Sequence, residues 1–338
     1  MRYYVLTTTK FAKECIEFGK YGSTTSNWLS NINKGDTVFI SQFNYKSQKI
    51  YGPFKVKFSL FYEKKEIYPN KKYYYRIDIQ FNKLRCIEET DIYLQGINSE
   101  NKDFAYRLIN LLQQNKHLHS ICFNNKEGKF ILQTIKNHGN ELKKFDNKIY
   151  IPDYEKLKVD SEFIANKNRL SKKSFFSSES DLETFIIFNL KNNKSVVYNQ
   201  LNKILNSIQN NDLNHSKIYN QFIFGNAYPS DIVIFNQNNI NILELKKTRL
   251  EKEMIAMIEK EIKKYCYYSL YSERLEENNN RQINFFLIVL NSEQNLKYKK
   301  YLEDYFKKSI KPISCFAKFS FTIVEYYLDN QTLSFRKI

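Results

Sequence analysis

The chain has 338 residues, 42% of them apolar and 16% aromatic, which is enough apolar material for about two folded domains and excludes a wholly disordered chain. Lys and Arg outnumber Asp and Glu by 53 to 36, and the net charge of +17 suits a polyanionic partner such as nucleic acid. No apolar stretch approaches a membrane span or a secretory signal, and the five cysteines are scattered, so we expect a cytoplasmic protein without a membrane partner or disulfides.

The first domain, expected over residues 1–150, opens with several short strands. The pattern predicts strands over 3–8, 37–41, 50–61 and 73–81, with a helix over 11–18 that ends at Gly19. A helix over 104–113 and a strand over 129–135 complete this domain. Strands of this length with few helices predict a small α+β barrel. His117, His119 and Cys122 are close in sequence, but we expect a solvated helix end there and not a metal site.

A polar, weakly periodic stretch over 151–176 is expected to be a linker, and the second domain follows over 177–338. It begins with a predicted helix whose apolar stripe is Leu182, Phe185, Ile186 and Leu190. Ser180 and Glu183 have the spacing of a capping box at the start of this helix. A carboxylate that closes a cap cannot also reach a metal site, so these two roles for Glu183 exclude each other.

The stretch 229–246, PSDIVIFNQNNINILELK, organises the second domain. Two apolar runs around a polar tetrapeptide predict a β-hairpin, with Asp231 at the mouth of its first strand. Glu244 and Lys246 lie two residues apart and therefore share one face of the second strand, with Leu243 and Leu245 on the other. Two carboxylates at one end of a hairpin provide the oxygen ligands that Mg²⁺ prefers. A lysine beside such an ion can orient or deprotonate an attacking water, because nearby positive charge and burial both lower its pKa.

The remaining elements predict an α/β fold. A long helix over 250–270 is followed by a strand over 282–290, apolar enough to be buried on both faces, then a helix over 297–307 and a last strand over 319–327. This order favours a mixed central sheet flanked by helices.

The hairpin resembles the PD-(D/E)xK nuclease motif, with Asp231 as the first acid and Glu244-Leu245-Lys246 as ExK, although Pro229-Ser230-Asp231 replaces a strict Pro-Asp. The segment SESDLETFI resembles the first helix of NucS-like members, whose glutamate matches Glu183. In many relatives the helix after ExK carries Gln-x-x-x-Tyr, and Glu261 and Tyr265 stand at those positions. The resemblance implies Glu183, Asp231, Glu244 and Lys246 as catalytic residues, with Mg²⁺ (or Mn²⁺) on Asp231 and Glu244.

The first domain resembles the EVE/YTH-like branch of the PUA superfamily over about residues 1–85. The resemblance rests on YYVLTT, INKGDTVFI, IYGPFKV and YYYRIDI, in which the family pattern falls on Gly35-Asp36, on Gly52 with Val56 and on Tyr74 with Arg76. Domains of this branch bind modified or flipped bases in an aromatic pocket. It therefore implies Trp28, Tyr45 and Arg76 as base-binding or nucleic-acid-binding residues, with Phe43 as a substitute for Tyr45. Trp28 could equally be a core residue.

Together these patterns predict a DNA-processing enzyme: a PUA-like reader joined to a Mg²⁺-dependent endonuclease, serving modification-dependent restriction or defence, and able to act as a homodimer. Two alternatives stay open. One is a structure- or mismatch-directed repair nuclease, and the other is a non-catalytic protein that binds modified nucleic acid.

Overall fold

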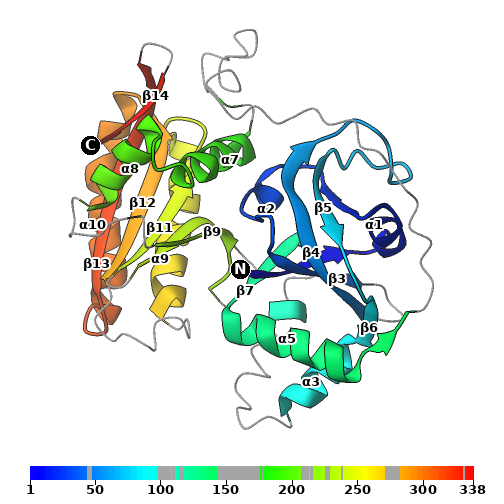
Figure 1. The fold of residues 1–338 in the computed structure, drawn as a ribbon. Coiled ribbons are helices and arrows are strands. Elements are labelled where there is room, and N and C mark those ends of the chain that lie inside the picture. Colours follow the sequence, from blue (N-terminus) through cyan, green and yellow to red (C-terminus); the bar gives the residue numbers. More distant parts are fainter. Residues whose placement is uncertain are drawn as a thin grey trace. The chain divides into compact units, whose positions relative to one another are not determined.

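A computed structural model describes residues 1–43, 48–97, 108, 111–113, 118–142, 176, 178–206, 213, 216–224, 229–236, 239–270, 282–329 and 332–338. The chain divides into two compact units, Met1–Leu157 and Lys158–Ile338. Each unit has its own β-sheet with helices against it (Figure 1). No helix in the described ranges is long and apolar enough to cross a membrane.

The first unit is built on a sheet of eight strands. Its main path runs β2-β5-β4-β3-β1-β7, and β6 joins β4 to β8. The strands are β1 (Tyr3–Thr8), β2 (Lys20–Ser23), β3 (Thr37–Phe43), β4 (Gln48–Tyr62), β5 (Tyr75–Gln80), β6 (Arg85–Glu88), β7 (Ser120–Phe123) and β8 (Asn140–Glu141). The helices are α1 (Ala12–Phe18), α2 (Asn27–Ser30), α3 (Glu89–Ile97) and α5 (Asn125–His138). Of the four strands predicted in the first 81 residues, β1 has the predicted bounds and β3, β4 and β5 have shifted ends. The elements that were not predicted in this unit are β2, β6, β7, β8, α2 and α3.

The two end strands of this sheet are linked through a side chain. Within the described residues no ladder joins β2 to β7, so the backbone pairing is an open path. Tyr21 on β2 donates its hydroxyl to the carbonyls of Thr7 and His119, at 2.6 and 2.8 Å, where β1 and β7 meet. A curved sheet whose edges are tied in this way has a barrel-like shape without complete closure.

The prediction of a strand over 129–135 is wrong, because these residues lie in helix α5. Asn124 and Glu127 form a capping box at its start, and each side chain binds the other residue's backbone N–H. Ile131 and Ile135 are fully buried one helical turn apart. Helix α5 also approaches β1 closely, since a Cβ added to Gly128 would lie 2.1 Å from the Cγ of Tyr3. Tertiary packing has therefore overridden the β-prone run of side chains.

Two other predictions lie mostly outside the described residues. Of the helix predicted over 104–113, only Leu108 and residues 111–113 are described, and they are helical. Of the linker predicted over 151–176, only Phe176 is described. That side chain is 5% exposed and belongs to the hydrophobic core of the second unit.

The second unit has a mixed sheet of six strands in the order β14-β13-β12-β11-β10-β9. Strands β11, β12 and β13 are parallel, and the other pairs are antiparallel. The strands are β9 (Lys217–Phe222), β10 (Ser230–Phe235), β11 (Asn239–Leu245), β12 (Gln282–Leu290), β13 (Lys318–Asp329) and β14 (Thr332–Lys337). The helices are α7 (Glu179–Leu190), α8 (Val196–Asn206), α9 (Lys252–Leu270), α10 (Gln294–Ile310) and the short η3 (Lys311–Ile313). The predicted sheet with flanking helices is present, while α8, β9 and β14 were not predicted.

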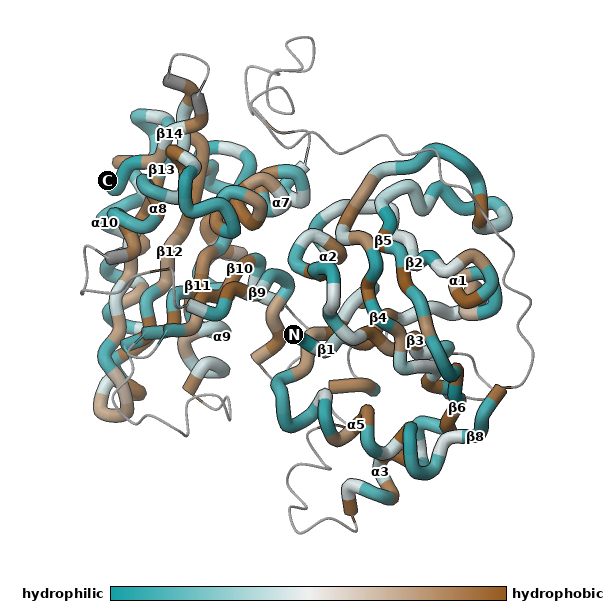
Figure 2. The backbone as a smooth tube through the Cα atoms, in the orientation of Figure 1, coloured by the Kyte–Doolittle hydropathy of each residue, from teal (hydrophilic) through white to brown (hydrophobic). Residues whose placement is uncertain are grey.

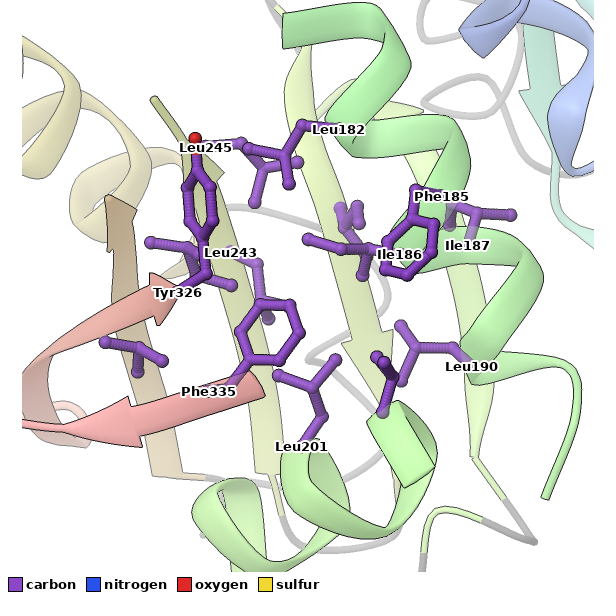
Figure 3. Packing of buried hydrophobic residues seen from close by; sticks show 14 of the residues in the cluster. Leu182, Phe185, Ile186, Ile187, Leu190, Leu201, Leu243, Leu245, Tyr326 and Phe335 are labelled. Atoms are coloured by element: carbon purple, nitrogen blue, oxygen red, sulfur yellow. The ribbon is translucent and has the colours of Figure 1, made fainter. Parts of the chain in front are cut away.

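Helices cover both faces of this sheet, as the apolar strands in Figure 2 require. On one face α7 and α8 pack against Leu243, Leu245 and their neighbours on β10 and β12 (Figure 3). On the other face Tyr265 of α9 stacks on Phe285, and Phe306 of α10 stacks on Phe321. The alternation along β11 therefore follows the predicted period of two, with Leu243 and Leu245 turned away from α9.

Candidate active site and base pocket

Hairpin β10–β11 places the two predicted acids opposite one another. Ile232 pairs with Leu243 and Val233 with Ile242, so the same register sets Asp231 across from Glu244 at the open end of the hairpin. Asp231 Oδ2 accepts a hydrogen bond from the N–H of Leu245 at 2.8 Å. The hairpin, with Asp231 and Glu244 at one end of it, is thus as the sequence predicts.

Lys246 lies directly after β11, and two carboxylates hold its side chain. Its Nζ lies 2.7 Å from Oε1 of Glu244 and 3.2 Å from Oε1 of Glu261 on helix α9. The lysine side chain is only 3% exposed. Glu261, predicted as an accessory residue, is therefore brought to the site through Lys246.

Glu183 does not cap helix α7. The N-cap is Ser178, and its capping box is completed by Asp181, so the prediction of a Ser180–Glu183 box is wrong. Glu183 follows Asp181 in the second turn of α7, and its side chain is buried. Its two carboxylate oxygens accept hydrogen bonds from Asn220 Nδ2 at 3.1 Å and from Gln221 Nε2 at 2.8 Å. The conflict between the two roles disappears, because a different serine starts the helix.

The electrostatics of this group follow from burying several acids together. Burial, then the negative charges of Glu244 and Glu183, raise the pKa of Asp231 well above its ordinary value. Burial raises the pKa of Glu244 to about 8, with Lys246 opposing the shift and Glu261 adding to it. The protein thus keeps more carboxylates here than its own cations neutralise.

The sequence predicts a lowered pKa for Lys246, and the structure shows the opposite. Burial lowers the pKa of Lys246, but the surrounding carboxylates outweigh it, led by Glu244 and Glu261, and the net shift is upward. Lys246 is therefore an ammonium at neutral pH, which donates hydrogen bonds and cannot accept a proton from water.

The donor atoms fit a hard cation, although the group is small. Oε2 of Glu244 and Oε2 of Glu261 are buried and have no hydrogen-bond partner. Across the described part of the chain, no group of three or more His, Cys, Asp or Glu side chains is close enough to hold a metal ion. Asp231 and Glu244 are the carboxylates that could bind one, and a Mg²⁺ ion held by one or two carboxylates completes its shell with water and phosphate oxygens.

Tyr265, predicted as an accessory residue, lies on α9 beside the hairpin. Its hydroxyl donates to the carbonyl of Pro229 at 2.8 Å and thereby ties α9 to the start of β10. Lys264 lies on α9 about one turn after Glu261, and its Nζ lies 4.6 Å from the centroid of the Tyr265 ring. Burial lowers the pKa of Lys264 to about 8, against the opposing effect of Glu244 and Glu261.

The first unit contains an aromatic-lined cavity of about 130 Å³ at the end of β1. The lining residues with rings come from four separate segments and are Phe11, Tyr21, Tyr68, Tyr73 and His119, joined by Thr7, Thr8 and Thr9. Phe11, Tyr68 and Tyr73 contact one another edge to face, with centroids 5.3–5.9 Å apart. Such a set of faces and hydroxyls can stack on a planar ring and bind its edge.

The sequence did not identify these lining residues, since they are brought together only by the fold. Tyr73 and His119 meet with ring centroids 6.0 Å apart although they are 46 positions apart in the chain. His119, expected at a solvated helix end, instead precedes β7, and burial lowers its pKa. The abundance of tyrosine was the available signal, but it does not indicate which rings share a cavity.

Of the three predicted base-binding residues, one lies near the cavity. Trp28 is half-buried on α2, and its ring lies 6.0 Å from that of His119. Tyr45 lies outside the described residues, and Phe43 ends β3 half-buried.

The prediction that Arg76 contacts nucleic acid is wrong. Its side chain is 0% exposed, is paired with Glu63, and donates to the carbonyls of Tyr73 and Lys65. An arginine so enclosed cannot reach a phosphate. Arg76 instead fixes the segment that carries Tyr68 and Tyr73, and thereby the positions of two rings that line the cavity.

Comparisons with known proteins yield only distant structural similarities. No protein-family model matches the sequence, and no curated protein matches it. A crystal structure of human THYN1 protein in complex with DNA containing 5-methylcytosine aligns with the N-terminal part, covering 40% of this chain and 99% of that chain at 15% identity and a TM-score of 0.32. A Pseudomonas putida protein (39% of this chain, 98% of that chain, 14% identity, TM-score 0.29) and a hypothetical protein from Leishmania major (40%, 95%, 13%, 0.29) also align. TM-scores of this size do not establish a shared function.

Proposed function

We propose that this protein is a metal-dependent DNA endonuclease whose N-terminal unit binds a base of its substrate. The observation that carries the proposal is the convergence of Asp231, Glu244 and Lys246 at one end of hairpin β10–β11, where Glu244 Oε2 is buried without a hydrogen-bond partner. An unsatisfied buried carboxylate oxygen costs about 1–3 kcal/mol or more, so it is retained where a ligand offsets that cost.

Each residue has a defined part in phosphodiester hydrolysis. Asp231 and Glu244 would hold Mg²⁺ or Mn²⁺, which when bound polarises a phosphoryl oxygen and lowers the pKa of water. Lys246 donates hydrogen bonds from a protonated amine and places positive charge where negative charge develops on the phosphate oxygens. Glu261 restrains that amine, and Glu183, held by Asn220 and Gln221, adds negative charge beside Asp231.

The aromatic cavity of the first unit supports the proposal that this unit recognises a base of the substrate. A base inside a duplex does not expose its face, so it must be extruded before it can enter a pocket lined by rings. Stacking contributes about 1–3 kcal/mol per base, and the net charge of +17 supplies binding to the phosphates that does not depend on sequence. A pocket that selects one extruded base, joined to a cleavage site, has the organisation of a modification-dependent restriction or defence nuclease.

The test is digestion of a matched pair of plasmids that differ only in base modification, in Mg²⁺ and in EDTA. We expect cleavage of the modified plasmid in Mg²⁺ alone, with at least a hundredfold loss for Asp231→Ala, Glu244→Ala or Lys246→Ala and retained DNA binding. Glu303→Ala, which removes a partly exposed carboxylate on α10, is the matched control and should cleave normally.

The other outcomes point to the alternative functions. Equal cleavage of both plasmids, or selective cleavage of mismatched or branched DNA, would indicate a structure-directed repair nuclease. Tight, selective binding without cleavage in any divalent metal would indicate a non-catalytic reader. Full activity in EDTA or in Lys246→Ala would refute the mechanism.

A further inference from the structure

A second, larger opening lies in the first unit and is separate from the aromatic cavity. It is a groove of about 680 Å³, within the size range of ligand sites, between the sheet and helix α5. Thr37, Lys55 and Gln80 lie side by side across β3, β4 and β5 at its edge, since Lys55 pairs with both of the others. The strand ends and α5 thus form the two walls.

The groove is basic, and none of its lining residues in the described part of the chain is acidic. Its cations are Lys55, Lys83, Arg85 and Lys136. Lys55 Nζ donates to Thr37 Oγ1 at 2.8 Å and to the carbonyl of Gly35 at 3.4 Å, so neutral oxygens fix its position and leave its charge uncompensated. Neither Lys83 nor Lys136 has an ion pair with any described residue.

Arg85 is also fixed in position. Its guanidinium donates to the carbonyls of Lys136 and Gly139 at the end of α5, at 2.7 and 3.2 Å. Among the described residues its one carboxylate neighbour is Glu141, at 3.7 Å and 46% exposed, which is a weak, solvent-screened pair. The groove therefore presents four cations, three of them without an acidic partner among the described residues.

The floor of the groove is apolar and carries an aromatic ring. Pro53, Phe81 and Leu132 are half-buried there. Phe81 packs edge to face on the fully buried Phe54, with centroids 5.6 Å apart, and its position is thereby set before any ligand arrives. Cations above an apolar, aromatic floor complement a ligand that has both phosphates and exposed ring faces.

The groove and the aromatic cavity lie at opposite ends of β1. Thr7 and Thr8 at the end of β1 line the cavity, whereas Met1 and Thr37, which pairs with Tyr3 at its start, line the groove. A six-residue strand is about 20 Å long, so one base cannot occupy both. The groove needs its own occupant or a separate part of a long one.

We propose that this groove binds a single strand of nucleic acid, with phosphates on the four cations and a base against Phe81. Single-stranded substrate is favoured over duplex because a duplex hides the base faces that the apolar floor would contact, leaving only its phosphates to bind. The site does not depend on the cavity or on cleavage.

The test is fluorescence anisotropy of a labelled 12-nucleotide oligo-dT with the full chain in EDTA, over a range of salt concentrations. The triple variant Lys55→Ala/Lys83→Ala/Lys136→Ala should bind at least tenfold more weakly than the control Lys57→Ala/Lys71→Ala/Lys126→Ala, which removes the same charge from exposed lysines outside both openings. Its slope of log K against log salt should fall by about 2 relative to the parent, because each lost phosphate contact on a single strand removes about 0.7.

Two further variants separate the groove from its alternatives. Phe81→Leu keeps the apolar volume but removes the ring face, and it should weaken binding about five- to tenfold with an unchanged salt slope. Tyr73→Ala, in the cavity, keeps all four groove cations, so the salt slope of oligo-dT binding should match that of the parent even if a base enters the cavity, and failure of the base-reading proposal is distinguishable from failure of this one. Equal weakening by the groove and control triples, or a groove effect on a 12-base-pair duplex larger than on the single strand, would overturn the proposal.

Discussion

Replacing Glu244 by Gln should make the metal-free protein more stable at alkaline pH. The carboxylate is 5% exposed, and its Oε2 has no hydrogen-bond partner. The pKa of Glu244 is about 8 in the folded protein, against an ordinary value of about 4.3 for an unfolded glutamate. The folded state therefore binds this proton more tightly, and the associated stability is complete below about pH 4.3 and is lost as the pH rises through 8.

The size of the effect follows from the shift. Each pKa unit corresponds to about 1.4 kcal/mol, so the loss between pH 5 and pH 8.5 is of the order of a few kcal/mol. For a domain of about 150–250 residues, 1 kcal/mol moves the melting temperature by about 2–4 °C. The melting temperature of Glu244→Gln should thus equal that of the parent near pH 5 and exceed it by about 5–10 °C at pH 8.5, because an amide does not ionise.

Differential scanning fluorimetry in EDTA from pH 5 to pH 9 measures this difference. Glu325→Gln is the matched control, because Glu325 is equally buried in the same unit but is fully bonded to Arg336, Ser292 and Asn295. It should be destabilised throughout the range. At pH 8.5, Mg²⁺ at ten times its dissociation constant should raise the stability of the parent by about 1.4 kcal/mol and leave Glu244→Gln unchanged. Parallel pH profiles for parent and variant would refute the reasoning.

Three other substitutions test the remaining structure. Glu183→Gln should stay folded, since Ser178 and not this residue caps α7, yet lose cleavage at least tenfold; an active variant would remove Glu183 from the site. Trp28→Ala should weaken binding of modified DNA about tenfold with an unchanged salt slope if its ring contacts the base, whereas a lower melting temperature with unaltered base preference would place it in the core. Gly128→Ala should lower stability by about 1–3 kcal/mol in chemical denaturation, because the new methyl group overlaps the Tyr3 ring; an unchanged midpoint would contradict that packing.

Most strands and helices of the second unit could be predicted from the local order of apolar and polar residues. The run 282–290 was predicted as a strand buried on both faces, and β12 has those bounds with seven of its residues buried in an unbroken run. The period of two along β11 likewise placed Glu244 and Lys246 on one face. These features depend on neighbours in sequence, which is why they could be predicted.

Features set by distant partners could not be predicted. Two overlapping capping boxes, Ser178–Asp181 and Ser180–Glu183, are equally good as sequence, and the packing of α7 on the sheet selects the first. The apolar run in α5 is as typical of a strand as of a helix, and its burial against β1 decides for the helix. Arg76 was predicted to bind nucleic acid from the family resemblance alone, and nothing near it in sequence identifies Glu63 as its partner.

Arg76 and Lys246 are both buried cations, but the groups around them differ. Arg76 is matched by one carboxylate, and backbone carbonyls accept from the rest of its guanidinium, so both charge and hydrogen bonds are balanced. Lys246 instead lies among Glu244, Glu261 and Asp231, two of which keep a buried oxygen without a hydrogen-bond partner. Burying these carboxyl groups together raises the pKa of Asp231 and of Glu244, so ionising them costs stability. A divalent cation at Asp231 and Glu244 would offset that cost, which is why we propose the metal site at the hairpin end and not at the Arg76 ion pair of the first unit.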